Sequence, residues 1–122
     1  MNMMNHLEKL ILRILERHRG RNDPVTCRQL EKIAGSGSRN IRKTIANLVI
    51  RHHIPIASSV LYPYGFYLIT NKQEAKNCLR QYYSRAREVV NRARILNEVV
   101  KEKFGISYQE EFDFVRKRKP ST

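Results

Sequence analysis

The feature that most constrains the fold is a segment of about 33 residues before Gly105 that contains neither glycine nor proline. Its apolar residues are separated alternately by four and three positions, which is the heptad spacing of a helix with one continuous apolar seam. Asn71 and Glu74 resemble a capping box at its start, and Gly105 is a natural stop. The predicted seam consists of Ala75, Leu79, Tyr82, Ala86, Val89, Ala93, Leu96 and Val100.

A helix of this length exceeds what the rest of a small domain can cover. Packing against the first helix of the chain would cover the first half of the seam. The second half needs another surface, and the simplest is the same helix of a second copy. The pattern leaves open whether the two helices run parallel or antiparallel, and whether the assembly is a dimer or a tetramer. The residues predicted for dimerisation are Leu79, Tyr82, Ala86, Val89, Ala93, Leu96 and Val100.

Three shorter helices are predicted ahead of this segment. Leucine and isoleucine recur at helical spacing over 5–18, with Glu8 among the charged residues expected to point outward. Thr26 can cap a second helix over 27–34. A glycine-serine turn separates it from a third helix over about 38–52, which Ser36 or Ser38 would cap. The core-facing residues predicted for the three helices are Leu7, Leu10, Ile11, Ile14, Leu15, Leu30, Ile33, Ile41, Ile45, Leu48 and Val49.

A hairpin follows the third helix. The runs 54–60 and 65–70 are short and rich in β-branched and aromatic residues, and the sequence LYPYG between them has turn chemistry. Val25 and Thr26 form a run long enough only for a bridging strand. The fold class is therefore mainly α with a small β-hairpin wing (α+β). The predicted organisation is a domain over 1–70, a long helix over 71–105 and a tail over 106–122. In that tail Phe112, Phe114 and Val115 alternate like a strand, and the final RKRKPST is expected to be disordered.

Charge is distributed unevenly along the chain. The net charge is +13, and no aspartate or glutamate occurs between Glu31 and Glu74. Residues 1–70 carry 11 lysines and arginines against 4 acids, and residues 71–104 carry 9 against 4, so the excess lies in the folded part. Such a balance predicts attraction to nucleic acid or to an anionic membrane surface.

The order helix, short strand, helix, turn, helix, hairpin resembles the winged helix-turn-helix family. The resemblance covers about residues 5–70 and rests on TCRQLEKIAGSGSRNIRKTIANLVIRHHIPIASSVLYPYGFYLIT. It is similar above all to small winged-helix proteins often carried by bacteriophages and mobile elements, in which a similar hairpin leads into an arginine-rich helix. The long C-terminal helix departs from a minimal winged helix, and in some regulators of the family such a helix dimerises the protein.

The resemblance implies a DNA-binding geometry, in which the third helix enters the major groove and the wing touches the backbone or the minor groove. Arginine and asparagine suit guanine and adenine edges, and a serine at the helix start suits a phosphate. The implied function is a dimeric, sequence-specific double-stranded DNA-binding protein, a transcriptional regulator of mobile-element type. The implied DNA-binding residues are Ser36, Ser38, Arg39, Asn40, Arg42, Lys43, Asn47, Arg51, Tyr62 and Tyr64.

Other classes of function find no support in the residues. There is no nucleophile elbow, phosphate-binding glycine loop or acid cluster, so no enzyme is predicted. The four histidines and the cysteines Cys27 and Cys78 lack the spacing of a zinc site, so neither a metal nor a cofactor is predicted. Two distant cysteines, no secretion signal and no apolar run of about 18 residues predict an intracellular protein without a membrane span.

Two alternatives remain open at this stage. The winged domain could bind nucleic acid without sequence preference, or serve as an interaction module in replication, recombination or packaging, with the aromatic tail as a docking peptide. RNA binding is the other, with Tyr62, Tyr64 and Tyr67 as stacking platforms. The target sequence, the sign of regulation and any effector are not encoded in a readable pattern.

Overall fold

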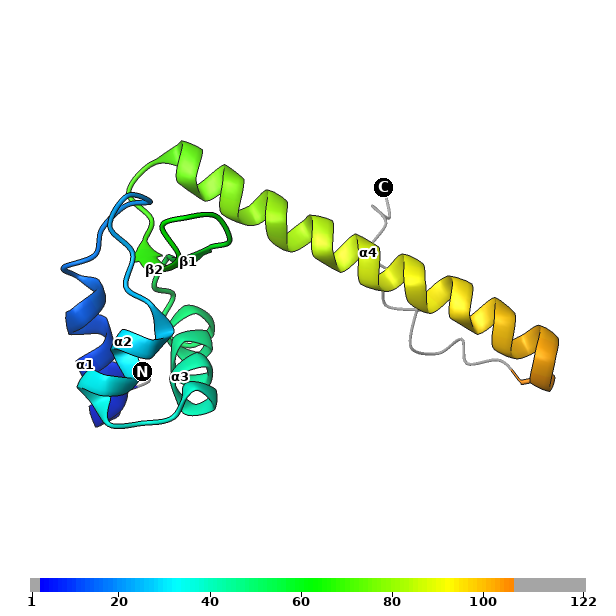
Figure 1. The fold of residues 1–122 in the computed structure, drawn as a ribbon, viewed down its shortest axis with the longest axis horizontal. Coiled ribbons are helices and arrows are strands. Elements are labelled where there is room, and N and C mark those ends of the chain that lie inside the picture. Colours follow the sequence, from blue (N-terminus) through cyan, green and yellow to red (C-terminus); the bar gives the residue numbers. More distant parts are fainter. Residues whose placement is uncertain (1–2, 107–122) are drawn as a thin grey trace. The chain divides into compact units, whose positions relative to one another are not determined.

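A computed structural model describes residues 3–106 of the chain, and within them it confirms the predicted fold class of a mainly helical protein with one antiparallel hairpin (Figure 1). The chain divides into two compact units, Met1–Arg80 and Gln81–Thr122. The predicted tail strand and disordered end fall outside the described residues. The elements are α1 (His6–Leu15), α2 (Cys27–Ala34), α3 (Ser38–Ile50), β1 (Ile56–Ser59), β2 (Gly65–Leu68) and α4 (Lys72–Phe104).

The core of the first unit lies where α1, α2 and α3 pack against one another and α1 meets β2 (Figure 1). Each helix supplies apolar residues at helical spacing, and each strand turns an apolar side chain toward the helices. Burial of these side chains is the main term that favours folding, at about 25 cal/mol for each Å² of apolar surface. The core consists of Ile11, Leu15, Val25, Leu30, Ile41, Ile45, Leu48, Ile56, Phe66 and Leu68.

The hairpin gains a third partner from the connection between α1 and α2. Within the hairpin, Ile56 lies opposite Leu68 and Ser59 opposite Gly65. Val25 then pairs with Phe66 through two backbone hydrogen bonds of 2.8 and 2.9 Å, which confirms the predicted bridging strand. Gly65 has φ +136, and a Cβ on it would lie 2.5 Å from the carbonyl oxygen of Val25. The close approach of the two backbones therefore depends on a glycine at this position.

Glu8 is buried, so the prediction that it points outward is wrong. Its side chain accepts from the Asn5 amide at 2.9 Å and Asn5 caps the Glu8 amide at 2.8 Å, a reciprocal capping box. Its Oε1 also lies 3.3 Å from Nε2 of His52, which follows α3. Only 4% of Glu8 is exposed. Helix α1 ends at Leu15, earlier than the predicted residue 18, because the next turn tightens through bonds between residues three apart.

Two residues predicted to face the core are exposed instead. Ile33 is 57% exposed on α2, and Val49 is 39% exposed on α3. Both lie at the edge of their apolar stripe, where periodicity alone does not decide which side the neighbouring helix covers. On α3 the buried position next to the stripe is taken by Thr44, whose hydroxyl donates to the Asn40 carbonyl oxygen at 2.8 Å.

The start of α4 is joined to the α1–α2 connection. As predicted, Asn71 Oδ1 accepts from the Glu74 amide at 2.9 Å. The Glu74 carboxylate does not close the predicted capping box. It accepts from the Thr70 amide at 2.9 Å and from the Arg21 amide at 2.8 Å. Partial burial alone would raise the pKa of Glu74, but the Thr70 and Arg21 hydrogen bonds outweigh it and lower that pKa. Gly105, with φ +72, ends α4 as predicted.

Replacing Gly65 by alanine tests the backbone contact. Gly65→Ala is expected to destabilise the protein by about 2–4 kcal/mol, because it combines a backbone clash with a strained positive φ. Gly37→Ala is the matched control, since a Cβ there meets nothing within 4 Å, and it should cost less than about 1 kcal/mol. Urea unfolding followed by circular dichroism measures both, and equal effects would contradict the contact.

Replacing Glu74 by glutamine tests how much its carboxylate contributes to the stability of the fold. Because the folded-state pKa lies below the ordinary 4.5, the carboxylate stabilises the protein above that pH and loses its contribution as the pH falls through the lowered value. Glu74→Gln should therefore cost about 1 kcal/mol at pH 7 and nothing at the lowest pH at which the protein folds. Glu88→Gln, at an exposed position of α4, should change the free energy of unfolding little.

Candidate nucleic-acid interface

The start of α3 has no side-chain cap, contrary to the prediction that Ser36 or Ser38 provides one. Gly35 ends α2 in the left-handed conformation, Gly37 is the N-cap of α3, and no side chain accepts from the first-turn amides. The Ser36 hydroxyl instead accepts from the Asn40 amide group at 2.7 Å. The first-turn N–H groups, which carry the positive end of the helix dipole, are therefore available to an anion.

The solvent-facing side of α3 is cationic over its first half. Ser38, Arg39, Asn40 and Lys43 are exposed, while Ile41 on the opposite side is fully buried. After the Asn40 side chain has donated to Ser36, its Nδ2 keeps one N–H and its Oδ1 can still accept, which is enough for an adenine edge. Within the α3 half of the predicted DNA-binding set, Ser36 precedes α3 and Arg51 caps its end, while the other members lie on the helix itself. All of them except Ser36 and Asn47 are exposed.

Arg42, Asn47 and Arg51 differ from the other predicted residues of α3. The Arg42 guanidinium lies 5.8 Å from the centre of the Phe66 ring, so it packs against β2 although it is exposed. Asn47 is half-buried, and Arg51 is the exposed C-cap of the helix. If Arg42 contacted a base, its guanidinium would either stay on the Phe66 ring or move away from it.

The second half of the same face is apolar, which sequence reasoning missed. Ile50 is 70% exposed, and Ala46 and Val49 are also open to solvent. Arg39, Lys43, Ala46 and Ile50 follow one another at steps of four, three and four, so they form one stripe that changes from cationic to apolar. The sequence contained this information, because Ala46 and Ile50 continue the helical spacing of Arg39 and Lys43 on the side opposite the buried residues.

The wing is held by an arginine that the sequence did not single out. The Arg21 guanidinium donates to the carbonyl oxygens of Leu61, Tyr62 and Pro63 at 3.0, 3.2 and 3.2 Å. The Tyr62 and Tyr64 rings meet edge to face with centroids 6.0 Å apart, and Tyr62 is 81% exposed. The wing therefore offers aromatic rings on a braced loop, and the cation next to it is already bound to the backbone.

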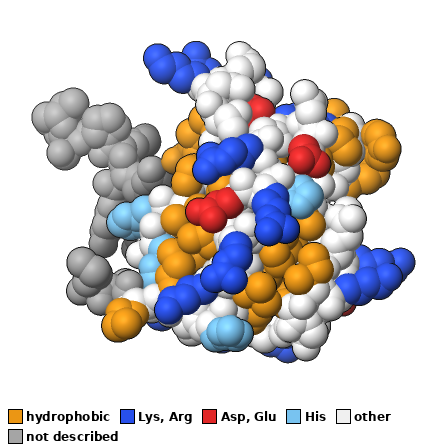
Figure 2. Space-filling view, turned by 90° about the vertical axis from the view of Figure 1, so that its left-hand side faces the viewer, with side chains coloured by type: hydrophobic (Ala, Val, Ile, Leu, Met, Phe, Trp, Pro, Cys, Tyr) orange, Lys and Arg blue, Asp and Glu red, His pale blue; other side chains and the backbone are white. Residues whose placement is uncertain are grey.

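Among residues 3–106 no acid neutralises a lysine or arginine side chain. Over residues 3–106 no lysine ammonium or arginine guanidinium lies within 4 Å of a carboxylate, and the charged-group contacts found there join histidines to acids, His18 with Asp23 and His52 with Glu8. Lysines and arginines are also spread over the face of the first unit that carries α1 and α2 (Figure 2). A surface with this excess of unpaired cations favours a polyanionic partner.

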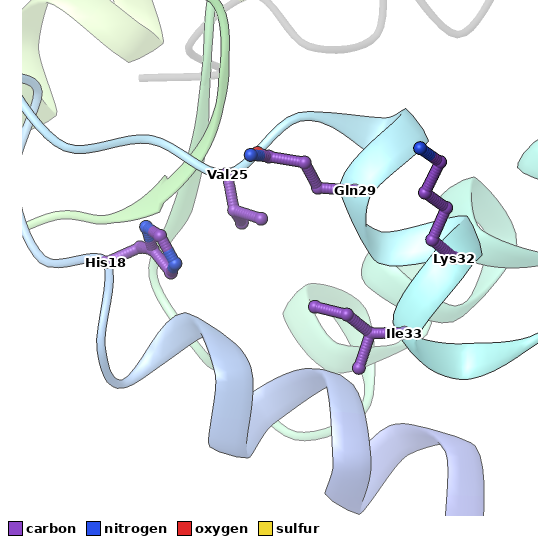
Figure 3. Close-up of a pocket in the computed structure, with 5 residues that line it drawn as sticks. All are labelled: His18, Val25, Gln29, Lys32 and Ile33. Atoms are coloured by element: carbon purple, nitrogen blue, oxygen red, sulfur yellow. The ribbon is translucent and has the colours of Figure 1, made fainter.

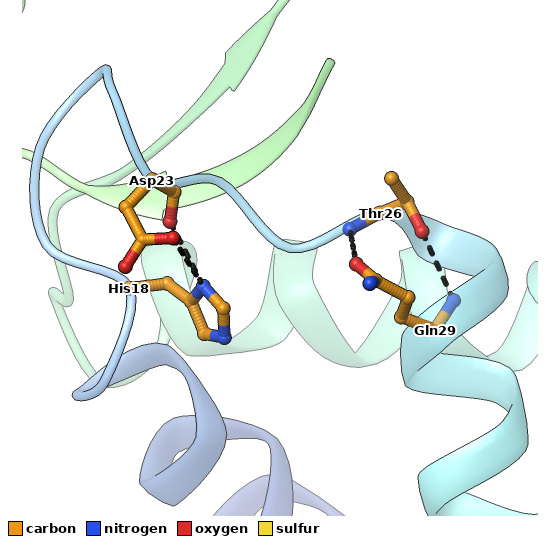
Figure 4. Close-up of polar contacts among 4 residues, drawn as sticks. All are labelled: His18, Asp23, Thr26 and Gln29. Carbon is orange, nitrogen blue, oxygen red and sulfur yellow. Dashed lines mark hydrogen bonds and ion pairs between the residues drawn. The ribbon is translucent and has the colours of Figure 1, made fainter. Parts of the chain in front are cut away.

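A shallow pocket of about 220 Å³ lies beside α2, lined by His18, Val25, Gln29, Lys32 and Ile33 (Figure 3). Two of its polar side chains already have partners (Figure 4). His18 Nδ1 lies 2.8 Å from the Asp23 carbonyl oxygen, and Gln29 accepts from the Thr26 amide at 2.9 Å in a capping box. The remaining lining is mostly apolar, and it offers no pair of groups arranged for catalysis.

The described residues contain no group of three or more histidines, cysteines or acids that could hold a metal ion. Burial, followed by the neighbouring Glu31, raises the pKa of the Cys27 thiol, with Arg42 opposing, so this thiol is protonated near neutral pH.

Among residues 3–106 no helix is both long enough and apolar enough to span a membrane.

Comparisons with protein-family models, with curated proteins and with solved structures found no match for this chain.

Replacing Arg21 by lysine tests the brace on the wing. A lysine ammonium cannot reach three carbonyl oxygens in the forked geometry of a guanidinium. Arg21→Lys should raise the amide hydrogen-exchange rate of the wing roughly tenfold, at constant temperature and pH. Arg19→Lys is the control two residues away and should leave those rates unchanged. Unchanged rates in Arg21→Lys would show that the wing is held by other contacts. The amides to follow are those of Val60, Leu61, Tyr62 and Tyr64.

Proposed function

We propose that this protein is a sequence-specific double-stranded DNA-binding protein of winged helix-turn-helix type, acting as a dimeric transcriptional regulator such as mobile elements carry. The observation that carries the proposal is the exposed face of α3, where Arg39 and Lys43 are free of carboxylates and the first-turn amides are uncapped. The chain from Glu31 to Glu74 adds no acid that would repel a phosphate backbone.

The proposed mechanism divides the contacts by chemistry. The uncapped start of α3 and Lys43 would hold phosphates, which fixes register without reading sequence. Arg39 would pair with guanine O6 and N7, and Asn40 with an adenine edge. The apolar half of the stripe, Ala46 and Ile50, would contact thymine methyl groups. The wing would add hydrogen bonds and packing from Tyr62 and Tyr64, not ion pairs.

The homodimer is proposed from α4. No residue of this helix is buried, and Leu79, Tyr82, Val89 and Leu96 are each more than half exposed. A second copy would cover this seam, and two copies of α3 would then read two half-sites of an inverted repeat.

Binding to single strands, or to duplexes without sequence preference, is the second candidate. The exposed edge-to-face pair of Tyr62 and Tyr64 favours it, because flat rings without a neighbouring free cation suit base stacking. Selection of bound duplexes from a random library, at about 0.15 M salt, separates the two. One enriched motif supports the regulator, and salt-sensitive binding without enrichment supports the second candidate.

Variants then assign the contacts. Arg39→Ala and Asn40→Ala should each relax the preference at particular base pairs by roughly 1–3 kcal/mol. Arg13→Ala is a control that removes the same charge from an exposed position of α1, and it should leave the preference intact. Equal losses of affinity for all sequences would show that Arg39 and Asn40 do not read bases. Fluorescence anisotropy with the selected duplex and single-base changes of it measures each variant.

A further inference from the structure

Helix α4 carries a seam whose large and small residues are arranged in a self-complementary order. Helix α4 is one continuous helix (Figure 1). Its seam alternates two kinds of position. One kind holds Leu79, Ala86, Ala93 and Val100, and the other holds Ala75, Tyr82, Val89 and Leu96. When two helices pair in parallel, each kind meets itself, and when they pair antiparallel, each kind meets the other. The order of sizes can therefore distinguish the two directions.

We propose that α4 pairs with α4 of a second copy in an antiparallel direction, with Leu79 opposite Leu96 of that copy. This inference rests on the homodimer of the proposed function. In this register Ala86 meets Val89, Ala93 meets Tyr82 and Ala75 meets Val100, so every alanine of the seam faces a larger side chain. Interdigitation of large with small residues is what fills a helix interface to the density of a protein interior.

The parallel direction packs less well. It sets Ala86 against Ala86 and Ala93 against Ala93, and it sets Tyr82 against Tyr82. Layers of two alanines leave gaps between the helices, while the tyrosine layer crowds them apart, so one helix spacing cannot satisfy both.

The length of α4 favours the same register. The pairing of Leu79 with Leu96 places the two-fold axis between residues 87 and 88. The helix spans Lys72–Phe104, whose midpoint is Glu88. The register that matches large with small residues is thus also the one that overlaps the two helices over almost their full length, without an unpaired end.

The flanks of the seam complete the arrangement. On one edge Tyr83 meets Val90 of the second copy, which widens the apolar contact. On the other edge Arg85 meets Arg92 of the second copy, twice by symmetry. The Arg85 guanidinium already lies 5.1 Å from the centre of the Tyr82 ring, at the side of the seam. Salt screens such exposed like charges over about 8 Å, so they weaken the dimer without reversing its direction. They also gather four guanidinium groups, which suits phosphates.

Single-cysteine variants test the direction without DNA. In a background of Cys27→Ser and Cys78→Ser, Leu79→Cys and Leu96→Cys are prepared separately as full-length chains. The antiparallel register predicts a disulfide between the two variants when they are mixed, because residues 79 and 96 face each other. It predicts none within either variant alone, since two copies of residue 96 would be about 25 Å apart. Disulfides within each variant, or none in the mixture, would overturn the inference.

A charge reversal provides a second measurement that leaves the seam intact. Arg92→Glu would place a carboxylate against Arg85 of the second copy and should lower the dissociation constant of the dimer about threefold to tenfold, by analytical ultracentrifugation at low salt. Arg94→Glu changes the net charge equally at a position away from the seam and should act less. Equal effects of the two variants, or a weaker dimer for Arg92→Glu, would overturn the antiparallel register.

The two experiments are separable from the test of DNA binding. A monomer that still enriches one duplex sequence would refute the antiparallel dimer and leave base reading by α3 in place. An antiparallel dimer that binds no DNA would refute the proposed DNA-binding function and leave the pairing of α4 in place.

Discussion

The backbone of the connection between α1 and α2 joins the hairpin to the helices of the first unit. Val25 pairs with Phe66, Gly20 donates to the Leu68 carbonyl oxygen, and Leu68 donates to that of His18. The same segment sends the Arg21 side chain to the wing and its amide to Glu74 at the start of α4. Hairpin, wing and the first turn of α4 are thus fixed by one short stretch of chain. A two-stranded hairpin alone is marginal in water, so this third partner is what makes the wing a stable element.

The sequence predicted the helices and strands better than it predicted the burial of the residues at the edges of their apolar stripes. The length of α4 follows from the spacing of its apolar residues and the absence of glycine and proline, and the bridging strand at Val25 follows from the shortness of its run. Glu8, Ile33 and Val49 were misplaced because helical periodicity locates the centre of a buried stripe, while the neighbouring helix decides its width. The buried Glu8 is tolerated since it serves both the cap of α1 and His52.

Of the candidate site, only the cationic part could be predicted from the sequence. Arg39 and Lys43 follow from a basic, acid-free helix, and their exposure agrees with it. The missing cap at Gly37, the apolar end at Ile50 and the role of Arg21 depend on contacts between segments far apart in the chain. Arg21 in particular precedes the wing by some forty residues, so no local pattern connects them.

The braced wing has a thermodynamic consequence for any partner that it meets. A loop that must become ordered on binding loses conformational entropy, typically about 0.5–1.5 kcal/mol for each side chain that is immobilised. Three hydrogen bonds from Arg21 and the edge-to-face contact of Tyr62 with Tyr64 impose that order beforehand. The wing is thus preorganised. Any affinity that the wing contributed to a complex would come almost undiminished from the surface that its rings bury, and bending of the loop would not accommodate a partner of the wrong shape.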